Sequence, residues 1–341
     1  MKILELFSGY GTASFALKRL NIPYELIGYS DIDKYANQCF KQNHCPEDVE
    51  DKLKLGDVTK IDEKTLPDFD LLTGGFPCQA FSVAGKMQGE LDPRGTLFYE
   101  IIRIAEHKQP KYMLIENVKG LTTKKFKDTF DKILSELNRI GYVVYWKVLN
   151  TKDYGVPQSR DRVWFVCFRK DVKHSFQFPE KEELKIFLKD ILEDEVNEKY
   201  YLSEKTIATL IRHGNKIINQ ECNPLVSGCI HANYFNMGGR DQQYCIDMSM
   251  VRKVNKLRIY DGISRTLNTT QGGGLTPLTS RVGKLRRLTP KECFRLQGFL
   301  NDEVNLEGLS DTQKYKLAGN GQSVNVVQKI FFKSFFNDYI I

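Results

Sequence analysis

Short apolar runs and helix-period segments alternate along the first 170 residues of the chain. Runs of the kind that form buried strands lie at 3–7, 24–29, 53–58, 69–73, 112–115, 142–149 and 163–168. Amphipathic, helix-period segments lie at 12–20, 34–43, 97–107 and 126–140. This alternation predicts an α/β fold with a doubly wound, mostly parallel sheet. Because no helix separates the last two runs, we expect them to form an antiparallel hairpin at one edge.

The pattern changes beyond residue 170. Residues 181–199 are acidic and compatible with a helix, whereas the chain from residue 200 onward is irregular, with glycine-containing loops. Helical periodicity returns at 286–299 and in a closing amphipathic segment at 325–336. We therefore predict a larger α/β domain of residues 1–180, completed by 315–341, and a smaller domain of short strands and loops at 181–314.

Composition narrows the class of protein. Hydrophobic residues make up 41% and charged residues 27% of the 341 residues, which suits a globular protein with a substantial core. No run of 18 apolar residues occurs, so no segment is expected to span a membrane. The chain enters its first strand at once, and its eight cysteines are irregularly spaced without a Cys-x-x-Cys pair. We expect a cytoplasmic protein with reduced thiols.

The positive charge is concentrated in one segment. The net charge is +7, and residues 200–290 hold 13 Lys and Arg against five Asp and Glu. A basic patch on one module is typical of a polyanion-binding protein, although charge alone is also compatible with a solvated face.

Cys78 follows the predicted strand 69–73 through the turn Gly74-Gly75-Phe76-Pro77. Pro77 fixes one backbone angle and favours an extended Phe76, so the thiol emerges from a stiff turn. Open α/β sheets place their chemistry at this end of a strand. The residue alone is compatible either with a buried structural cysteine or with a nucleophile.

A glycine-bearing loop, Phe7-Ser8-Gly9-Tyr10-Gly11, follows the first strand and suits close approach of a ligand to backbone N–H groups. Ser14 stands where a dinucleotide-binding fingerprint requires its third glycine, which disfavours an NAD-dependent oxidoreductase. Asp31 ends the second strand 20 residues after Gly11, a spacing that suits ribose hydroxyls. Asp57 offers a second carboxylate for an adenine amino group, so an adenosine-bearing cofactor is predicted.

Two further clusters lie near strand ends. Glu116 follows the apolar run 112–115, next to the strand that leads to Cys78, and can act there as an acid or a hydrogen-bond donor. Gln158-Ser159-Arg160-Asp161-Arg162 places two guanidinium groups at one rim. The two guanidinium groups are suited to bind a phosphate or a base carbonyl. Alternatively, they form a surface ion-pair cluster with Asp161.

In this order, the motifs resemble those of the DNA cytosine-5 methyltransferases, in particular the compact bacterial modification type. The resemblance covers nearly the whole chain. It rests on Phe7-Ser8-Gly9-Tyr10-Gly11, Gly56-Asp57, Gly75-Phe76-Pro77-Cys78-Gln79, Glu116-Asn117-Val118, Gln158-x-Arg160-x-Arg162, Arg286-Arg287-Leu288-Thr289-Pro290-Lys291-Glu292-Cys293 and Gly319-Asn320. It implies a Rossmann-like methyltransferase sheet with a β- and loop-rich target-recognition domain, S-adenosylmethionine as methyl donor and cytosine in duplex DNA as acceptor.

The resemblance also implies residue roles. Cys78 is implied to add to carbon 6 of the cytosine, and Glu116 to bond ring nitrogen 3 and the amino group. Arg162, with Arg160 nearby, is implied to hold the base carbonyl and the local backbone. The implied cofactor-binding residues are Phe7, Gly9, Gly11, Asp31, Ile32, Asp57, Val58, Pro77 and Asn320.

DNA contacts are expected from two regions. Carbon 5 is unreachable inside a duplex, so the target base must be flipped out, and residues 79–95 are predicted to close over it as a lid. The predicted DNA-contacting residues are Gln79, Ser82, Arg94, Arg240, Thr266 and Leu267. Arg240 suits either bidentate bonding to guanine or a phosphate contact. Cys222, Cys229, His231 and Cys245 match no standard zinc-ligand spacing, so no metal is predicted.

The chain departs from the family pattern at two places. Ile32 follows Asp31 where family members often carry an aromatic residue that stacks on the adenine, and Gly321-Gln322 interrupts the usual Gly-Asn-Ser-Val pattern. We expect a monomer that acts on duplex DNA in a bacterial or phage setting, with or without a cognate restriction endonuclease. Two alternatives stay open at this point: a tRNA substrate, and a catalytically silent DNA-binding module.

Overall fold

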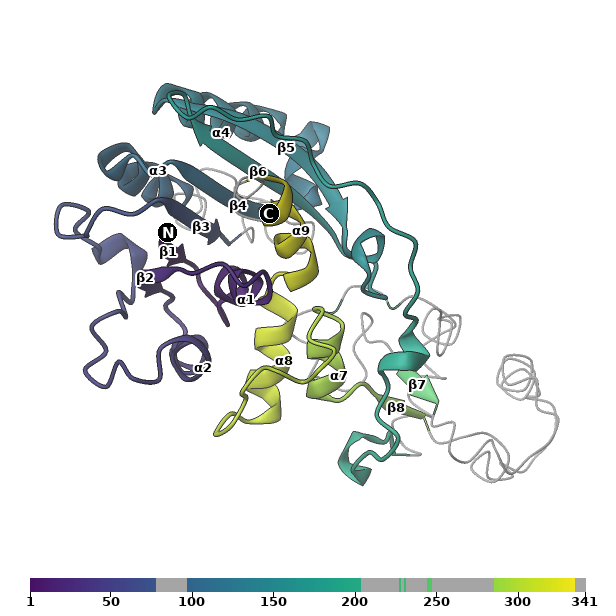
Figure 1. Ribbon diagram of the computed structural model, residues 1–341. Helices are drawn as coiled ribbons and strands as arrows, with labels where there is room; N and C mark the ends of the chain where they lie inside the picture. The colour runs from purple at the N-terminus through teal and green to yellow at the C-terminus, as the bar shows by residue number, and fades with distance from the viewer. Residues whose placement is uncertain (78–96, 204–226, 228–229, 231–243, 247–284, 335–341) are drawn as a thin grey trace, which may run out of the picture.

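The computed structural model describes residues 1–77, 97–203, 227, 230, 244–246 and 285–334 (Figure 1). Its centre is a six-stranded sheet in the order β2-β1-β3-β4-β6-β5. The strands are β1 (Lys2–Leu6), β2 (Glu25–Ser30), β3 (Leu71–Gly75), β4 (Tyr112–Val118), β5 (Tyr142–Asn150) and β6 (Asp161–Arg169). The neighbours among β1 to β4 pair in parallel, whereas β6 is antiparallel to both β4 and β5.

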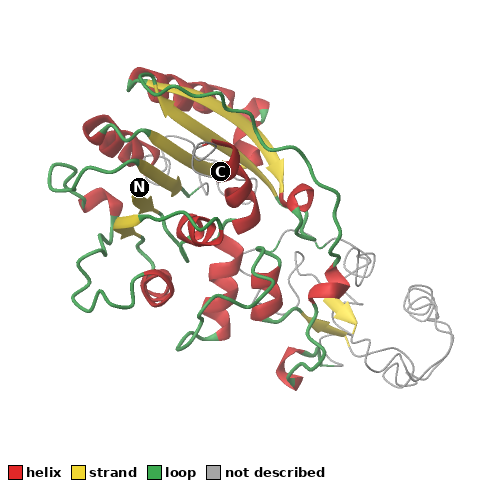
Figure 2. Ribbon diagram, in the orientation of Figure 1, coloured by secondary structure: helices red, strands yellow, loops and turns green. Residues whose placement is uncertain are grey.

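Helices cover both faces of the sheet, as Figure 2 shows. The helices are α1 (Thr12–Arg19), α2 (Lys34–His44), α3 (Leu97–Lys108), α4 (Lys127–Arg139), α7 (Pro290–Arg295), α8 (Asp311–Asn320) and α9 (Val324–Ser334). The 3₁₀ helices are η1 (Val58–Lys60), η3 (Lys119–Thr122), η4 (Lys124–Phe126), η5 (Thr151–Tyr154), η6 (Leu188–Ile191) and η7 (Glu198–Tyr200). A second sheet pairs β7 (Tyr244–Ile246) with β8 (Leu285–Arg287).

The alternation of side chains along the strands explains this layering. In β1, Ile3 packs into the cluster that includes α1 and α9, whereas its neighbour Leu4 packs into the cluster that includes α3 and α4. Leu71 and Leu72 of β3 divide between the two clusters in the same way. Both faces of the central strands are therefore buried, which is why those strands read as continuous apolar runs. The predicted doubly wound α/β fold is confirmed.

The end of the chain completes the layer that α1 begins. α9 packs against α1, and both contribute to the same hydrophobic cluster. The helices among the described residues are all too short or too polar to cross a membrane. The division into domains at residues 180 and 315 stays a prediction.

Three sequence predictions about elements were wrong. Residues 53–58 form no strand: Lys54 makes one isolated bridge to Tyr29, and the chain then turns at Gly56, where φ is +70°. Residues 181–199, whose sequence is compatible with a helix, contain only the 3₁₀ helices η6 and η7. Residues 286–299 contain β8 and the short α7 instead of one helix.

Two other features were missed by periodicity. The last two strands of the sheet do pair antiparallel, but β6 also inserts between β4 and β5, so its order in the sheet differs from its order in the chain. α8 has a weak apolar stripe, and only its capping box, in which Ser310 and Gln313 bond reciprocally, marks its start.

Candidate active site

The carboxyl ends of β1 to β4 meet at one edge of the sheet, and the predicted site residues follow those ends. After β1 the chain enters the glycine-bearing loop, where Phe7, Gly9 and Gly11 have φ values of +52°, +55° and +81°. Glycine is required at position 11 by a close approach as well, since a Cβ there would lie 2.3 Å from His44 Nε2. The sequence therefore forms a tight loop, with open space beside the Gly9 backbone.

Asp31 connects this loop to the end of β2. Its Oδ2 accepts a hydrogen bond from the Gly9 N–H at 3.0 Å, and its Oδ1 accepts from the Asp33 N–H at 2.9 Å. Burial raises the pKa of the Asp31 carboxyl, which the two backbone bonds partly offset. The following side chain, Ile32, is 81% exposed although it is apolar. The Asp31 carboxylate is thus hydrogen-bonded to the glycine-bearing loop, and the exposed apolar side chain of Ile32 follows it in the sequence.

The second predicted carboxylate lies near the same strand end. The Ser30 hydroxyl of β2 donates to the Gly56 carbonyl at 2.7 Å and so fixes the turn that leads to Asp57. Asp57 caps η1 by accepting from the Thr59 N–H at 3.0 Å, and this bond is the main cause that lowers the pKa of its carboxyl. Val58 is buried in the core beneath it.

Glu116 and Arg162 form an ion pair at the adjoining edge of β4 and β6. Arg162 Nε lies 2.8 Å from Glu116 Oε1, and the two side chains are 18% and 12% exposed. The parallel register places Glu116 opposite Gly75, the last residue of β3. The neighbouring Asn117 donates from Nδ2 to the Phe76 carbonyl at 3.2 Å, and so holds the turn that continues through Pro77.

Arg160 has different surroundings from Arg162, although the sequence reasoning grouped them. Its guanidinium is buried and donates from Nη1 to the Ile230 carbonyl at 3.1 Å. Its Nη2 donates to the carbonyls of Gly319 and Gly321 at 3.0 and 2.8 Å. These bonds hold the backbone around Asn320, the exposed last residue of α8. Arg160 therefore fixes main chain, while Arg162 pairs with the carboxylate.

Sequence reasoning missed three residues that shape the site. The Tyr10 hydroxyl donates to the Gln322 carbonyl, and its ring would lie 1.9 Å from a Cβ at Gly321. His44 Nε2 lies 2.9 Å from the Tyr10 carbonyl, and burial lowers the pKa of His44 to about 3. The signals that could have found them are the glycines at 11 and 321, since each marks a close approach.

Several predicted residues lie outside the described residues. They are Cys78, Gln79, Ser82, Arg94, Arg240, Thr266 and Leu267. Within the described part of the chain, no group of three or more His, Cys, Asp or Glu side chains is arranged to hold a metal ion.

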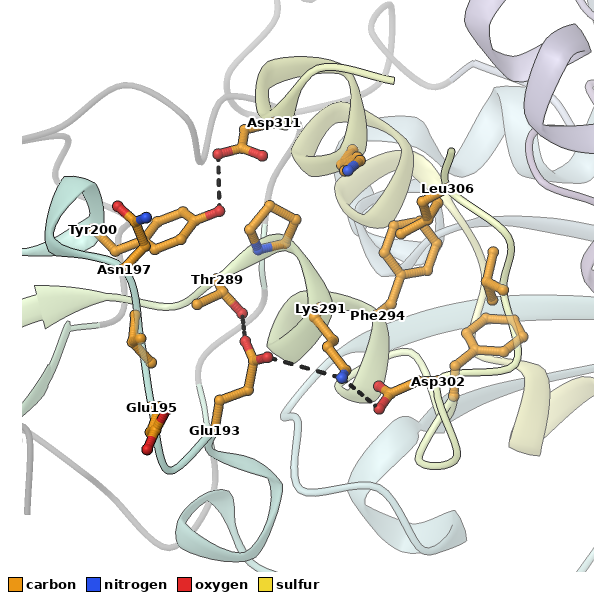
Figure 3. A pocket seen from close by; sticks show the side chains of 15 residues that line it. Glu193, Glu195, Asn197, Tyr200, Thr289, Lys291, Phe294, Asp302, Leu306 and Asp311 are labelled. Atoms are coloured by element: carbon orange, nitrogen blue, oxygen red, sulfur yellow. Dashed lines mark hydrogen bonds and ion pairs between the residues drawn. The ribbon is translucent and has the colours of Figure 1, made fainter. Parts of the chain in front are cut away.

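A cavity of about 510 Å³ lies elsewhere, between the segment around η7 and the helices α7 and α8 (Figure 3). Its apolar part includes Phe294 and Leu306, and ion pairs of Lys291 with Glu193 and Asp302 cross its polar side. It contains none of the predicted catalytic or cofactor-binding residues.

Comparison with known proteins supports the interpretation of these motifs. The protein is 35% identical to the type II methyltransferase M.HhaI of Haemophilus parahaemolyticus, over 97% of this chain and 93% of that protein. It is 32% identical to the orphan methyltransferase M.SPRI of Bacillus phage SPR, over 100% and 98% of the two chains. The crystal structure of the S. pombe Dnmt2 methyltransferase has the same fold, with a TM-score of 0.72, 22% identity and 97% coverage of both chains.

The sequence model of one family, described as C-5 cytosine-specific DNA methylase, matches residues 1–335. That match spans the glycine loop, the Glu116–Arg162 pair and the turn between α8 and α9 in a single alignment. The predicted resemblance is thereby confirmed, and this protein belongs to the C-5 cytosine-specific DNA methylase family.

Proposed function

We propose that the protein transfers a methyl group from S-adenosylmethionine to carbon 5 of a flipped-out cytosine in duplex DNA, through a covalent adduct with Cys78. The observation that carries this proposal is the Glu116–Arg162 pair, 2.8 Å apart, opposite the end of the strand that leads to Pro77 and Cys78. Family membership supports the reaction class. The local geometry supports the assignment of roles.

The residues at the ends of β1 and β2 fit the cofactor. Apart from Gly9 and its two chain neighbours, no described atom lies within 4 Å of where a Cβ of Gly9 would be, so a ligand can approach that backbone closely. Asp31 is held beside it and suits the ribose hydroxyls, and Asp57 suits the adenine amino group. The exposed side chain of Ile32 offers an apolar surface to the adenine, in place of an aromatic ring. When bound there, the cofactor supplies an electrophilic methyl group.

The chemistry explains why a thiol and a carboxyl are needed together. Carbon 5 of cytosine is a poor nucleophile until the Cys78 thiolate forms a bond to carbon 6, which shifts an electron pair toward carbon 5. Glu116 bonds ring nitrogen 3 and the amino group, and so stabilises the charge that the addition pushes into the ring. After carbon 5 takes the methyl group, its proton leaves to a base, the carbon 5–carbon 6 double bond re-forms and the thiolate is expelled.

The two arginines take different parts in this scheme. We assign Arg162 two contacts: its Nε orients the Glu116 carboxylate, and its guanidinium bonds the base carbonyl. Arg160 is a positioning residue, since its Nη2 donates to the backbone carbonyls on either side of Asn320 and its Nη1 to the Ile230 carbonyl. Of the two parts implied for this pair, the base carbonyl and the local backbone, we assign the backbone to Arg160.

DNA recognition is assigned to segments outside the described residues. We propose that residues 79–95 close over the flipped base, and that the basic region containing Arg240, Thr266 and Leu267 reads the target sequence. Relatives of this protein are bacterial and phage methyltransferases, including orphan ones. We therefore expect activity on DNA in a bacterial cytoplasm as a monomer, with or without a cognate endonuclease.

Incubation with duplex DNA and labelled S-adenosylmethionine, followed by nucleoside analysis, should yield 5-methylcytosine. Methylation of the exocyclic amine would overturn the proposal, and faster turnover on tRNA than on duplex DNA would assign a different substrate. A duplex with 5-fluorocytosine at the target should trap a covalent adduct with the native protein and none with Cys78→Ala. Bisulfite sequencing of a plasmid exposed to the protein would then identify the recognition sequence.

A further inference from the structure

A short, strongly basic segment follows β4, directly beside the candidate active site. β4 ends at Val118, which pairs with Arg162 at the start of the neighbouring strand β6 (Figure 1). From residue 119 to residue 127 the chain holds four lysines and no acidic residue. The catalytic scheme proposed above uses none of these lysines, so their charge needs another explanation.

Local contacts fix the position of this segment relative to the active site. Lys119 Nζ lies 3.1 Å from Asp161 Oδ2, which ties the start of η3 to the residue that precedes Arg162. Leu121 and Phe126 are buried in the same hydrophobic cluster as the apolar side chains of β4 that face α3 and α4. The backbone of η3 and η4 is therefore anchored at the edge of the sheet where β4 ends and β6 begins.

The other three lysines of the segment project from this anchored backbone. Lys124, Lys125 and Lys127, here called the lysine patch, are all exposed. They lie in η4 and at the first residue of α4. Cations at the start of a helix lie at the positive end of its dipole, and like charges three positions apart repel each other. The lysine patch therefore does not stabilise α4, which favours an anion outside the chain as its partner.

The location of the lysine patch indicates which anion that is. In the proposed function, the flipped cytosine is bound by Glu116 and Arg162, whose side chains are 2.8 Å apart at the end of β4. The sugar and phosphates of that nucleotide stay connected to the duplex on both sides, so the strand must pass along the residues that follow β4. Phosphate contacts of this kind position a duplex without reading its sequence, and a lysine ammonium suits them as a flexible point charge.

We propose that Lys124, Lys125 and Lys127 bind phosphates of the DNA strand that carries the flipped cytosine, next to the target nucleotide. The lysine patch thereby holds this strand against the edge formed by β4 and β6. This inference rests on the proposed function. It adds a phosphate-binding surface that lies outside the basic region at residues 200–290, and it predicts weaker binding of DNA of any sequence when the charges are removed.

The salt dependence of DNA binding tests this surface on the full-length protein. In the double variant Lys124→Gln/Lys127→Gln, the plot of log Kd against log salt concentration should be shallower by roughly two, one for each lost phosphate contact. At 0.1 M salt, each lost contact should weaken binding roughly tenfold, for target and unrelated duplexes alike. Methylation at sub-saturating DNA should fall in proportion.

The matched control removes two exposed lysines just beyond the other end of β6. Lys170→Gln/Lys173→Gln changes the net charge by the same amount, and the antiparallel pairing of β6 with β4 places these residues at the opposite edge of the sheet. Binding should stay within about twofold of the native protein, because charges farther away than the Debye length are screened. Equal losses in the two double variants, or no loss in either, would overturn the inference.

Neutral phosphate analogues test where on the duplex the contacts lie. Methylphosphonates in place of the two phosphates next to the target cytosine should weaken binding by the native protein and by the control variant. They should add little further loss to Lys124→Gln/Lys127→Gln, because the same contacts are already absent. Fully additive losses would overturn the placement beside the target nucleotide. A native protein that neither binds nor methylates duplex DNA would instead overturn the proposed function.

Discussion

Two arginine–carboxylate pairs in this protein differ in how many acceptor positions of the carboxylate are already occupied by hydrogen bonds. Glu292 accepts from Arg286 Nη1 and Nη2 at 2.8 and 2.7 Å, and also from the backbone N–H groups of Thr289 and Glu193 at 2.7 and 2.8 Å. The side chains of this pair are 3% and 0% exposed. Arg162 Nε lies 2.8 Å from Glu116 Oε1, and the side chains of Arg162 and Glu116 are 18% and 12% exposed.

The difference separates a structural pair from a binding pair. All acceptor positions of Glu292 are occupied, and they join the start of α7 to the segment that precedes η7. Glu116 keeps one oxygen for a ligand. Since a buried carboxylate is costly unless it is satisfied, an incompletely satisfied one at a strand end indicates function. The same substitution should therefore affect the two sites in opposite ways.

The largest expected effect is on turnover. Glu116→Gln should reduce kcat for DNA methylation roughly 10³-fold, because the amide cannot stabilise the charge formed on nitrogen 3. Its free energy of unfolding should change less than that of the corresponding Glu292 variant, because Glu116 loses one ion-pair contact whereas Glu292 holds a guanidinium and two backbone N–H groups. Methyl incorporation and urea unfolding measure the two quantities. Retention of kcat within a few fold would contradict the assignment of Glu116.

Glu292→Gln should show the reverse. We expect a loss of about 3 kcal/mol in the free energy of unfolding, because the Arg286 charge stays buried without its counter-charge. Turnover per folded molecule should change little at low temperature. Urea denaturation with active-site titration tests this, and a variant as stable as the native protein would show that the buried pair contributes no stability.

Tyr10→Phe removes one hydrogen bond and keeps the ring that packs against Gly321. Loss of the hydrogen bond to the Gln322 carbonyl should reduce the free energy of S-adenosylhomocysteine binding by about 1 kcal/mol, which is a roughly fivefold weaker affinity. The neighbouring core should be unaffected, so unfolding provides the control. Unchanged cofactor affinity would show that Arg160 alone fixes the turn.

The smallest expected effect concerns Glu5, a buried carboxyl that accepts from the Ser14 N–H at 3.0 Å instead of from an arginine. Burial raises its pKa to about 7, so the folded state retains a proton that the unfolded state has lost. The contribution of Glu5 to the free energy of unfolding is fully present below pH 4.5, the pKa of the carboxyl in the unfolded chain. It is lost as the pH rises through about 7, the pKa in the folded protein.

Raising the pH from 6.5 to 8 should therefore lower the free energy of unfolding by about 1 kcal/mol. The protonation of His44 does not contribute between pH 6.5 and 8, because burial lowers its pKa to about 3. Glu5→Gln should flatten this dependence. A native protein whose stability is constant across the window would contradict the raised pKa.

The sequence could predict the residues that stand at strand ends. Asp31 and Glu116 were found because apolar runs end beside them, and parallel strands bring such ends to one edge. Proline and glycine identified the turn that leads to Cys78. Local rules sufficed wherever the signal and its structural cause lie within a few residues of each other.

Longer-range relations could not be predicted in that way. Tyr10 and Gln322 are separated by 312 positions, and nothing local to either residue indicates the hydrogen bond between them. Arg160 and Arg162 have the same side chain and adjacent places in one motif, yet tertiary contacts give them different partners. The insertion of β6 between β4 and β5 is likewise a property of the packed sheet.

The packing of α9 on α1 has a consequence for how the protein is made on the ribosome. α1 completes its hydrophobic cluster only with α9, and the glycine-bearing loop gains its bond to Gln322 from the turn that precedes α9. In a nascent chain the glycine-bearing loop therefore lacks this bond until the turn between α8 and α9 has been synthesised.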